Sequence, residues 1–159
     1  MQMRQFLLAL VAVGLAVPAS ATLGVATAAP PGTIDPVPLT TREVSELTSF
    51  SSPSGNIGCY IAPTNVRCDI AERNWSPPPK AASCPEMVSW GQGLQLDVGK
   101  PAGFVCAGDT ALTNGSPLAY GDKIVSGSIE CTSTTDGMSC WDFVYGGSFD
   151  ISREAYTIR

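Results

Sequence analysis

The feature that most constrains this chain is a cysteine pattern that occurs twice. Ser54–Cys68 reads Ser-Gly-Asn-Ile-Gly-Cys, then eight residues and a cysteine, and Ser126–Cys140 reads Ser-Gly-Ser-Ile-Glu-Cys with the same spacing. The offset between the two segments is 72 residues throughout. Because opposed residues of an antiparallel pair have a constant sum of positions, this spacing fits two hairpins, each closed by a cross-strand disulfide. The predicted bonds are Cys59–Cys68 and Cys131–Cys140.

The same register predicts the turns of the two hairpins. Residues 62–65 and residues 134–137 would form four-residue loops, which are commonly built around a type I turn. Asn65 and Gly137 occupy the same closing position, and these residue types tolerate a positive φ angle best. A slip of one residue would place the two cysteines of a hairpin on opposite faces of the sheet.

Zinc binding and redox activity of the cysteines are less compatible with the sequence than disulfides are. A zinc site requires closely spaced cysteine pairs or histidines, and a redox pair is usually Cys-x-x-Cys; the sequence contains neither pattern and no histidine. Six cysteines in an exported chain favour three disulfides. By elimination the third is Cys84–Cys106, although other connectivities stay open, and a Cys59–Cys131 bond would contradict the two-hairpin interpretation.

The N-terminal residues have the order of a secretory signal peptide. Arg4 precedes an apolar run over residues 6–17, and small residues follow. We expect residues 1–28 to be removed, with cleavage after Ala21 as the alternative. Residues 29–47 predict a proline-rich spacer, in which residues 41–48 are compatible with a short helix capped by Thr41. The sequence has no second long apolar run, so we expect no membrane span.

Residues 48–159 predict a single β-rich domain. Short runs with alternating or β-rich composition are separated by turn residues, and no long window has a helical period. The expected strands cover residues 56–61, 66–70, 94–98, 103–106, 118–126, 128–132, 138–144, 148–151 and 155–158. The predicted fold class is all-β: a small antiparallel barrel or sandwich of short, disulfide-linked strands with little helix.

Charge and composition exclude several classes of function. From residue 29 onward the chain has eight basic and fourteen acidic residues, a net charge of −6, so nucleic acid and anionic lipid are poor partners. The absence of histidine excludes Ser-His-Asp and Cys-His catalysis and histidine-ligated metals. We expect no cofactor and no metal.

At these residues the chain resembles small exported, disulfide-containing proteins of actinobacteria that share a Ser-Pro-x-Gly-Asn-Ile-x-Cys opening. That opening is Ser52-Pro53-Ser54-Gly55-Asn56-Ile57-Gly58-Cys59 here, preceded by Phe50 and one extra serine. The resemblance continues through residues 66–70, Trp75, Phe104, Cys106, residues 108–110, Leu118, residues 120–121 and residues 149–156. Such proteins are described only as secreted and of unknown function, so the resemblance implies export, cross-linking and a β-rich fold, and no catalytic residues.

Four residues are candidates for ligand binding: Trp75, Trp90, Asp109 and Tyr120. The two tryptophans lie near predicted loops, where they could stack on sugars or grip a peptide, or else pack internally. Asp109, like Asp122, follows a glycine, so it could act as an acid or a calcium ligand, although a local Asx turn is the more ordinary role.

Two other residues are expected to be structural. Trp141, beside Cys140, is expected to pack in the core, and Arg67 is expected to form a solvated surface pair with Asp69 or Glu130.

These observations favour a secreted, non-enzymatic module that binds an envelope glycan or protein through its loops. One alternative is a carboxylate-dependent hydrolase, which would need Asp109 and a second acid in one cleft. The other is a disulfide-rich inhibitor or host-directed effector that presents the proline loop at residues 77–79. The sequence does not predict the oligomeric state.

Overall fold

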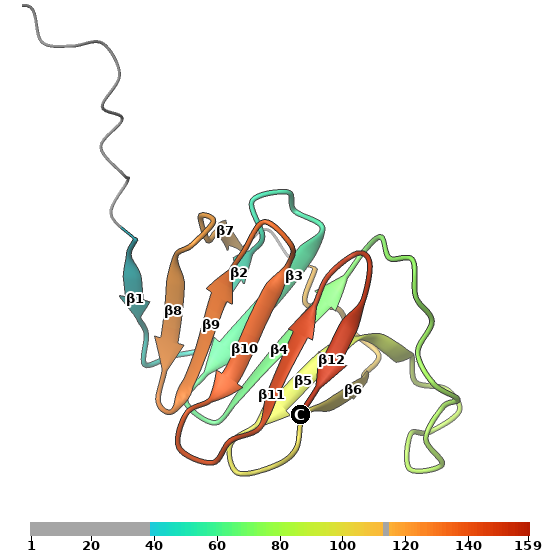
Figure 1. Ribbon diagram of the computed structural model, residues 1–159. Coiled ribbons are helices and arrows are strands. Elements are labelled where there is room, and N and C mark those ends of the chain that lie inside the picture. The colour runs from blue at the N-terminus through green and yellow to red at the C-terminus, as the bar shows by residue number, and fades with distance from the viewer. Residues whose placement is uncertain (1–38, 113–114) are drawn as a thin grey trace, which may run out of the picture. The chain divides into compact units, whose positions relative to one another are not determined.

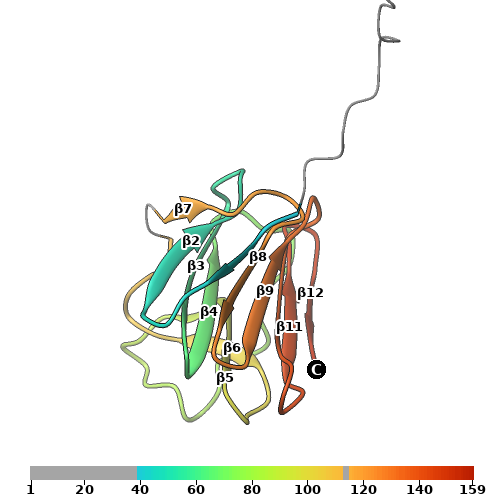
Figure 2. The same cartoon turned by 90° about the vertical axis from the view of Figure 1, so that its left-hand side faces the viewer.

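The computed structural model describes residues 39–112 and 115–159. The predicted signal peptide and most of the predicted spacer lie outside the described residues. The described chain forms two sheets that pack face to face (Figures 1 and 2). Sheet A has the order β1 (Thr41–Glu43), β8 (Lys123–Ser126), β9 (Ile129–Ser133), β10 (Met138–Asp142), β11 (Ser148–Ile151) and β12 (Tyr156–Ile158). Sheet B has the order β6 (Gly103–Cys106), β5 (Trp90–Asp97), β4 (Asn65–Ile70), β3 (Ile57–Ala62), β2 (Thr48–Ser51) and β7 (Ser116–Pro117).

The all-β prediction is confirmed, and of its two architectures the sandwich is the one observed. Each sheet has six strands and open edges, so neither closes into a barrel. The sheets are mixed rather than purely antiparallel, because β1 pairs in parallel with β8 and β2 pairs in parallel with β7. Within the described residues no segment is helical, and none is a long apolar helix that could cross a membrane.

The two predicted hairpins are present with the predicted register. Cys59 faces Cys68 in the β3–β4 pair, and Cys131 faces Cys140 in the β9–β10 pair. Both pairs are joined by disulfides whose Cα atoms lie 4.1 Å apart, and the third bond joins Cys84 to Cys106. One copy of the repeated segment therefore lies in each sheet.

The four-residue loop predicted at residues 134–137 lies between the paired residues Ser133 and Met138, but the other turn predictions were wrong. Ala62 pairs with Asn65, so the first turn has only Pro63 and Thr64 between the paired residues. Among the described residues, no residue other than glycine has a positive φ, and Gly137 is not one of the glycines that do. Gly137 is needed for space instead, since a Cβ atom there would collide with the carbonyl oxygen of Ile151 on the neighbouring strand.

The core lies between the sheets and contains both hairpin disulfides. Alternation produces it: in β9, Ile129, Cys131 and Ser133 are buried, while Glu130 and Thr132 between them are not. The largest fully buried apolar side chains are Phe50, Ile61, Leu94, Leu96, Val66 and Val105 from sheet B, and Ile124, Ile129, Met138, Phe149 and Ile151 from sheet A.

Two secondary-structure predictions need correction. The short helix predicted over residues 41–48 is absent: Thr41–Glu43 forms β1, because its backbone pairs with β8 of sheet A. Sheet A thus includes a strand that precedes the predicted start of the domain at residue 48. The strand predicted over residues 118–126 begins only at Lys123, because the chain turns at Gly121, where φ is 90°.

Candidate functional site

The two candidate tryptophans lie where the edge strands of the two sheets approach each other. Trp75 donates its indole N–H to the carbonyl oxygen of Ser152 at 2.9 Å, and its ring lies 4.8 Å from that of Tyr156 on β12. Trp90 donates to the carbonyl oxygen of Pro78 at 3.0 Å and packs 5.8 Å from Phe104 on β6. Both rings are half-buried, so both contribute to packing at this edge.

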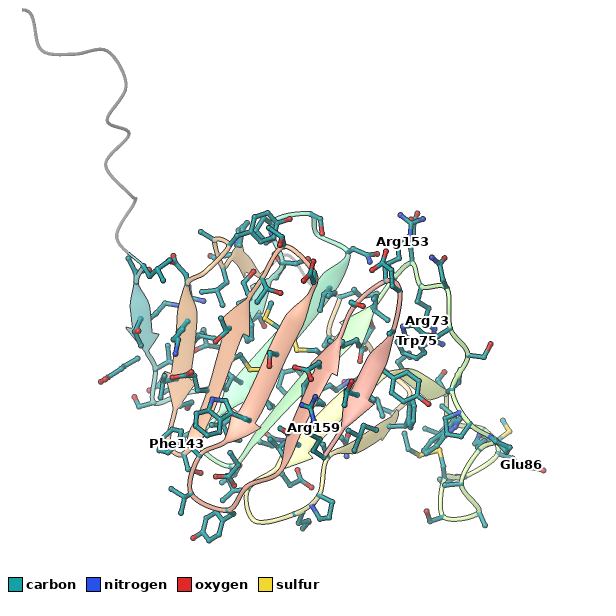
Figure 3. The ribbon with its side chains drawn as sticks, viewed as in Figure 1. Arg73, Trp75, Glu86, Phe143, Arg153 and Arg159 are labelled. Atoms are coloured by element: carbon teal, nitrogen blue, oxygen red, sulfur yellow. A yellow bond between two sulfur atoms is a disulfide. The ribbon has the colours of Figure 1, made fainter. Side chains whose placement is uncertain are left out.

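The guanidinium of Arg73 covers part of Trp75. Its central carbon lies 4.4 Å from the centre of the indole, in a cation–π contact that Figure 3 shows near Arg153. Arg73 also donates to the carbonyl oxygen of Gly91. This face of Trp75 is therefore occupied by the chain itself.

The carboxylate of Asp109 belongs to a network centred on Arg67. Arg67 donates to Asp109 Oδ1 at 2.7 Å and, through Nε and Nη2, to both oxygens of Asp69 at 2.9 and 2.7 Å. Asp69 also accepts the N–H of Ala111 at 2.8 Å. The segment after β6 thus lies across the outer face of sheet B and is held there by this network. Gly58 makes room for it, because a Cβ at residue 58 would lie 2.5 Å from the carbonyl oxygen of Ala111.

Asp69, one of the two expected partners of Arg67, does pair with it, but the expected exposure of this pair to solvent was wrong. Arg67 is 3% exposed and Asp69 is fully buried, because the segment after β6 covers them. Burial alone lowers the pKa of Arg67, but its hydrogen bonds to Asp69 and Asp109 outweigh burial and raise that pKa. The same hydrogen bond and charge of Arg67 lower the pKa of Asp109. A carboxylate held ionised by a neighbouring guanidinium is a poor general acid.

Asp122 holds the N-terminal end of β1, and Trp141 lies on the outer face of sheet A. Asp122 accepts the backbone N–H of Thr40 at 2.8 Å, which lowers its pKa and fixes the entry to β1. Trp141 does not pack in the core as expected: it is 45% exposed, because alternation along β10 turns Cys140 inward and Trp141 outward. Its indole N–H donates to Glu130 Oε1 at 3.3 Å, and its ring packs 5.9 Å from Phe143.

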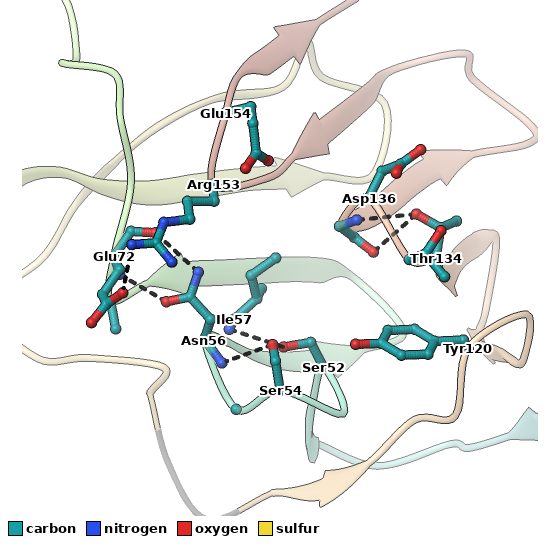
Figure 4. A pocket seen from close by; sticks show the side chains of 14 residues that line it. Ser52, Ser54, Asn56, Ile57, Glu72, Tyr120, Thr134, Asp136, Arg153 and Glu154 are labelled. Carbon is teal, nitrogen blue, oxygen red and sulfur yellow. Dashed lines mark hydrogen bonds and ion pairs between the residues drawn. The ribbon is translucent and has the colours of Figure 1, made fainter.

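The fourth candidate, Tyr120, lies in a hollow of about 500 Å³, which we call the loop pocket. It is formed where the β2–β3, β7–β8, β9–β10 and β11–β12 loops and the end of β4 converge (Figures 1 and 4). Its lining residues are Ser52, Ser54, Gly55, Asn56, Ile57, Ala71, Glu72, Tyr120, Thr134, Thr135, Asp136, Gly137, Arg153 and Glu154. Trp75, Trp90 and Asp109 are not among them, so the structure does not bring the four candidates together.

The Ser-Pro-Ser-Gly-Asn-Ile motif forms the floor of the loop pocket. Ser52 Oγ accepts the N–H of Ile57 at 3.1 Å and lies 3.1 Å from Ser54 Oγ. Asn56 exchanges two hydrogen bonds with the backbone of Glu72, at 2.9 and 2.8 Å, and so joins the motif to the end of β4 (Figure 4). The floor is therefore fixed by its own side chains before any ligand is present.

The wall of the loop pocket carries the charged and aromatic groups. Arg153 and Glu72 form an exposed pair at 3.0 Å. Asp136 and Glu154 are exposed, and the described residues provide no ion pair for either carboxylate. Tyr120, which is 48% exposed, lines the same pocket. The pocket thus combines an aromatic ring, two unpaired carboxylates and one arginine.

Sequence reasoning identified Tyr120 but missed the rest of the loop pocket. The motif was assigned to the hairpin alone, although its Ser and Asn residues are the types that cap turns and hold loops. Asp136 and Glu154 had no local signal, since they lie in loops far apart in the sequence. Among the described residues there is no cluster of three or more His, Cys, Asp or Glu side chains that could hold a metal ion.

The fold and this pocket define a class of protein: a disulfide-linked all-β sandwich with a polar pocket enclosed by the loops at one end. The chain matches DUF6636, a family of unknown function, over residues 37–158, and it belongs to that family. No curated protein and no solved structure matches the chain. Three disulfides indicate an oxidising, extracytoplasmic environment.

Proposed function

We propose that this chain is an exported, non-enzymatic binding module and that the loop pocket takes a sugar residue of an envelope glycan. The observation that carries the proposal is the composition of the pocket wall: Tyr120 offers a ring face, and Asp136 and Glu154 offer unpaired acceptor oxygens. Sugars present hydroxyl donors around an apolar ring face, so carboxylates and an aromatic ring recognise them together. The predicted signal peptide of residues 1–28 and the three disulfides support export.

The pre-formed floor supports binding rather than turnover. Loops that are already hydrogen-bonded lose little conformational freedom when a ligand binds, which favours affinity. A hydrolase is less well supported, because Asp109 is held as the ion partner of Arg67 and lies outside the loop pocket. The bond from Trp90 to Pro78 fixes the proline loop while Pro78 and Pro79 stay exposed, so this bond does not count against the inhibitor alternative.

The test is calorimetric titration of the oxidised protein with soluble envelope glycan fragments. Wild type should bind at least one fragment, and Tyr120→Ala and Asp136→Asn should each lower the affinity about tenfold, the loss expected for one stacking or charged hydrogen-bond contact. Tyr145→Ala is the matched control, because Tyr145 is an exposed tyrosine that does not line the loop pocket. Failure of every fragment to bind wild type, or equal losses in the control, would refute the proposal.

A further inference from the structure

A group of exposed apolar side chains lies on and beside the loop between β10 and β11. Trp141, Phe143, Val144 and Tyr145 are 45, 46, 61 and 66% exposed, and we call these four residues the aromatic tip. The β10–β11 loop leaves the sandwich at the end opposite the β9–β10 and β11–β12 loops, so the tip and the loop pocket lie at opposite ends (Figure 1). Figure 3 shows Phe143 at the lower end and Arg153 of the loop pocket at the upper end.

Four backbone N–H groups of the β10–β11 loop are paired within the protein. The N–H of residue 143 donates to the carbonyl oxygen of Ser128 at 3.0 Å, and the N–H groups of residues 144 and 145 donate to Asp142 Oδ1 at 3.1 and 3.2 Å. The N–H of residue 146 donates to the carbonyl oxygen of Asp142 at 2.8 Å. An unpaired N–H strongly disfavours entry into an apolar medium, and these four N–H groups are all paired.

A shallow hollow that contains two cationic side chains lies beside the tip. It has a volume of about 260 Å³ and is lined by Gly99, Lys100, Pro101, Tyr145, Gly146, Gly147 and Arg159. Two cations and no acid line it. Asp97 and Asp150, which pair with these cations at 3.3 and 2.9 Å, lie outside the lining. An anionic group that reaches the base of the aromatic tip would meet both cations, in competition with these two carboxylates.

We propose that the aromatic tip docks on a phospholipid bilayer and that the hollow receives a lipid phosphate. Trp and Tyr favour the headgroup level of a bilayer, and Lys and Arg beside them favour the phosphates. The net negative charge of the chain means that apolar insertion, rather than overall charge, drives docking. One loop offers too few residues for a stable dimer, which uses roughly 20–30 residues on each side, so a second copy is a weaker occupant.

Vesicle flotation at several protein concentrations tests this proposal, with phosphatidylcholine alone and with added phosphatidylglycerol. Wild type should float with both vesicles, because phosphatidylcholine also carries a phosphate and apolar insertion drives docking. Phe143→Ser/Tyr145→Ser should lower partitioning about tenfold, since each half-exposed side chain has apolar area left to bury. Leu47→Ser/Met87→Ser is the matched control and should float like wild type, because both side chains are exposed and apolar and neither belongs to the aromatic tip or lines the loop pocket.

A second measurement keeps the test decisive if the double variant does not fold. Lipids brominated in their acyl chains should quench the emission of Trp141 in otherwise wild-type protein, and Trp141→Phe should abolish that quenching. Absence of flotation by wild type, or unchanged flotation of a folded double variant, would overturn the proposal. A reversible dimer that disappears in the double variant without flotation would also overturn it, in favour of self-association. The vesicles contain no glycan, so this outcome is independent of the loop pocket.

Discussion

Replacing Arg67 with methionine removes the positive charge from a buried network and leaves the Asp69 carboxylate without its ion partner. Arg67 is 3% exposed and Asp69 is fully buried. Loss of one partner of a buried pair usually destabilises a protein by about 3–5 kcal/mol. Methionine fills most of the vacated volume, and Asp69 keeps the N–H of Ala111 and the hydroxyl of Thr110 at 2.8 and 3.1 Å, so we expect about 3 kcal/mol. For a domain of this size, that corresponds to a fall in Tm of about 10 °C.

The assay is urea unfolding of the oxidised protein under non-reducing conditions. Lys123→Met is the control, because Lys123 and Glu130 form a 2.8 Å pair in which the lysine is 42% exposed, and such pairs contribute less than about 1 kcal/mol. Adding Asp69→Asn to Arg67→Met removes the unpaired charge and should recover part of the lost stability. If Arg67→Met costs no more than Lys123→Met, the inference that Arg67 and Asp69 form a buried, interdependent pair is wrong.

Two further predictions concern strand residues that contact neighbouring loops: Asp142 at the end of β10 and Gly58 in β3. Asp142 is buried, which alone raises its pKa, but the N–H groups of Gly99, Val144 and Tyr145 outweigh burial and lower it. A carboxyl group whose pKa is lower in the folded state stabilises the fold at pH values above its ordinary pKa. This stabilisation is lost as the pH falls through the folded-state pKa. As the pH is lowered past about 4, the Tm of wild type should therefore decrease more steeply than the Tm of Asp142→Asn. At pH 7, thermal melts should show that Asp142→Asn lowers the free energy of unfolding by about 1–3 kcal/mol. In urea unfolding, Gly58→Ala should lower the free energy of unfolding by about 1–3 kcal/mol, because the added methyl group would displace the backbone of Ala111. An unchanged unfolding midpoint would contradict the close approach of these two segments.

The hairpins could be predicted because their information is local. Equal cysteine spacing and alternation fix which residues face each other, and the observed pairs of Cys59 with Cys68 and of Cys131 with Cys140 follow from them. The prediction for Trp141 did not apply this alternation to the residue next to the cysteine. An inward Cys140 requires an outward neighbour, so alternation already indicated an exposed indole.

The remaining features depend on contacts between residues far apart in the sequence. Thr41 pairs with Lys123, and Phe50 pairs with Ser116, so β1 and β7 are strands only because distant partners are present. Arg67 has the position of a solvated residue on the outer face of sheet B, and it is buried only because the segment after β6 crosses that face. The loop pocket has the same origin, since its wall is assembled from four loops and its composition is not periodic in the sequence.

The arrangement of the disulfides bears on whether the two proposed sites influence each other. Cys59–Cys68 joins β3 to β4 within sheet B, Cys131–Cys140 joins β9 to β10 within sheet A, and both bonds lie in the one buried core. Energetic coupling requires an element with two arrangements that both ligands bias, and a cross-linked, close-packed core opposes such an element. We therefore expect a saturating glycan fragment to change vesicle partitioning less than about twofold, measured by flotation with and without the fragment. A change of fivefold or more would correspond to about 1 kcal/mol of coupling and would require the core to have a second packing arrangement.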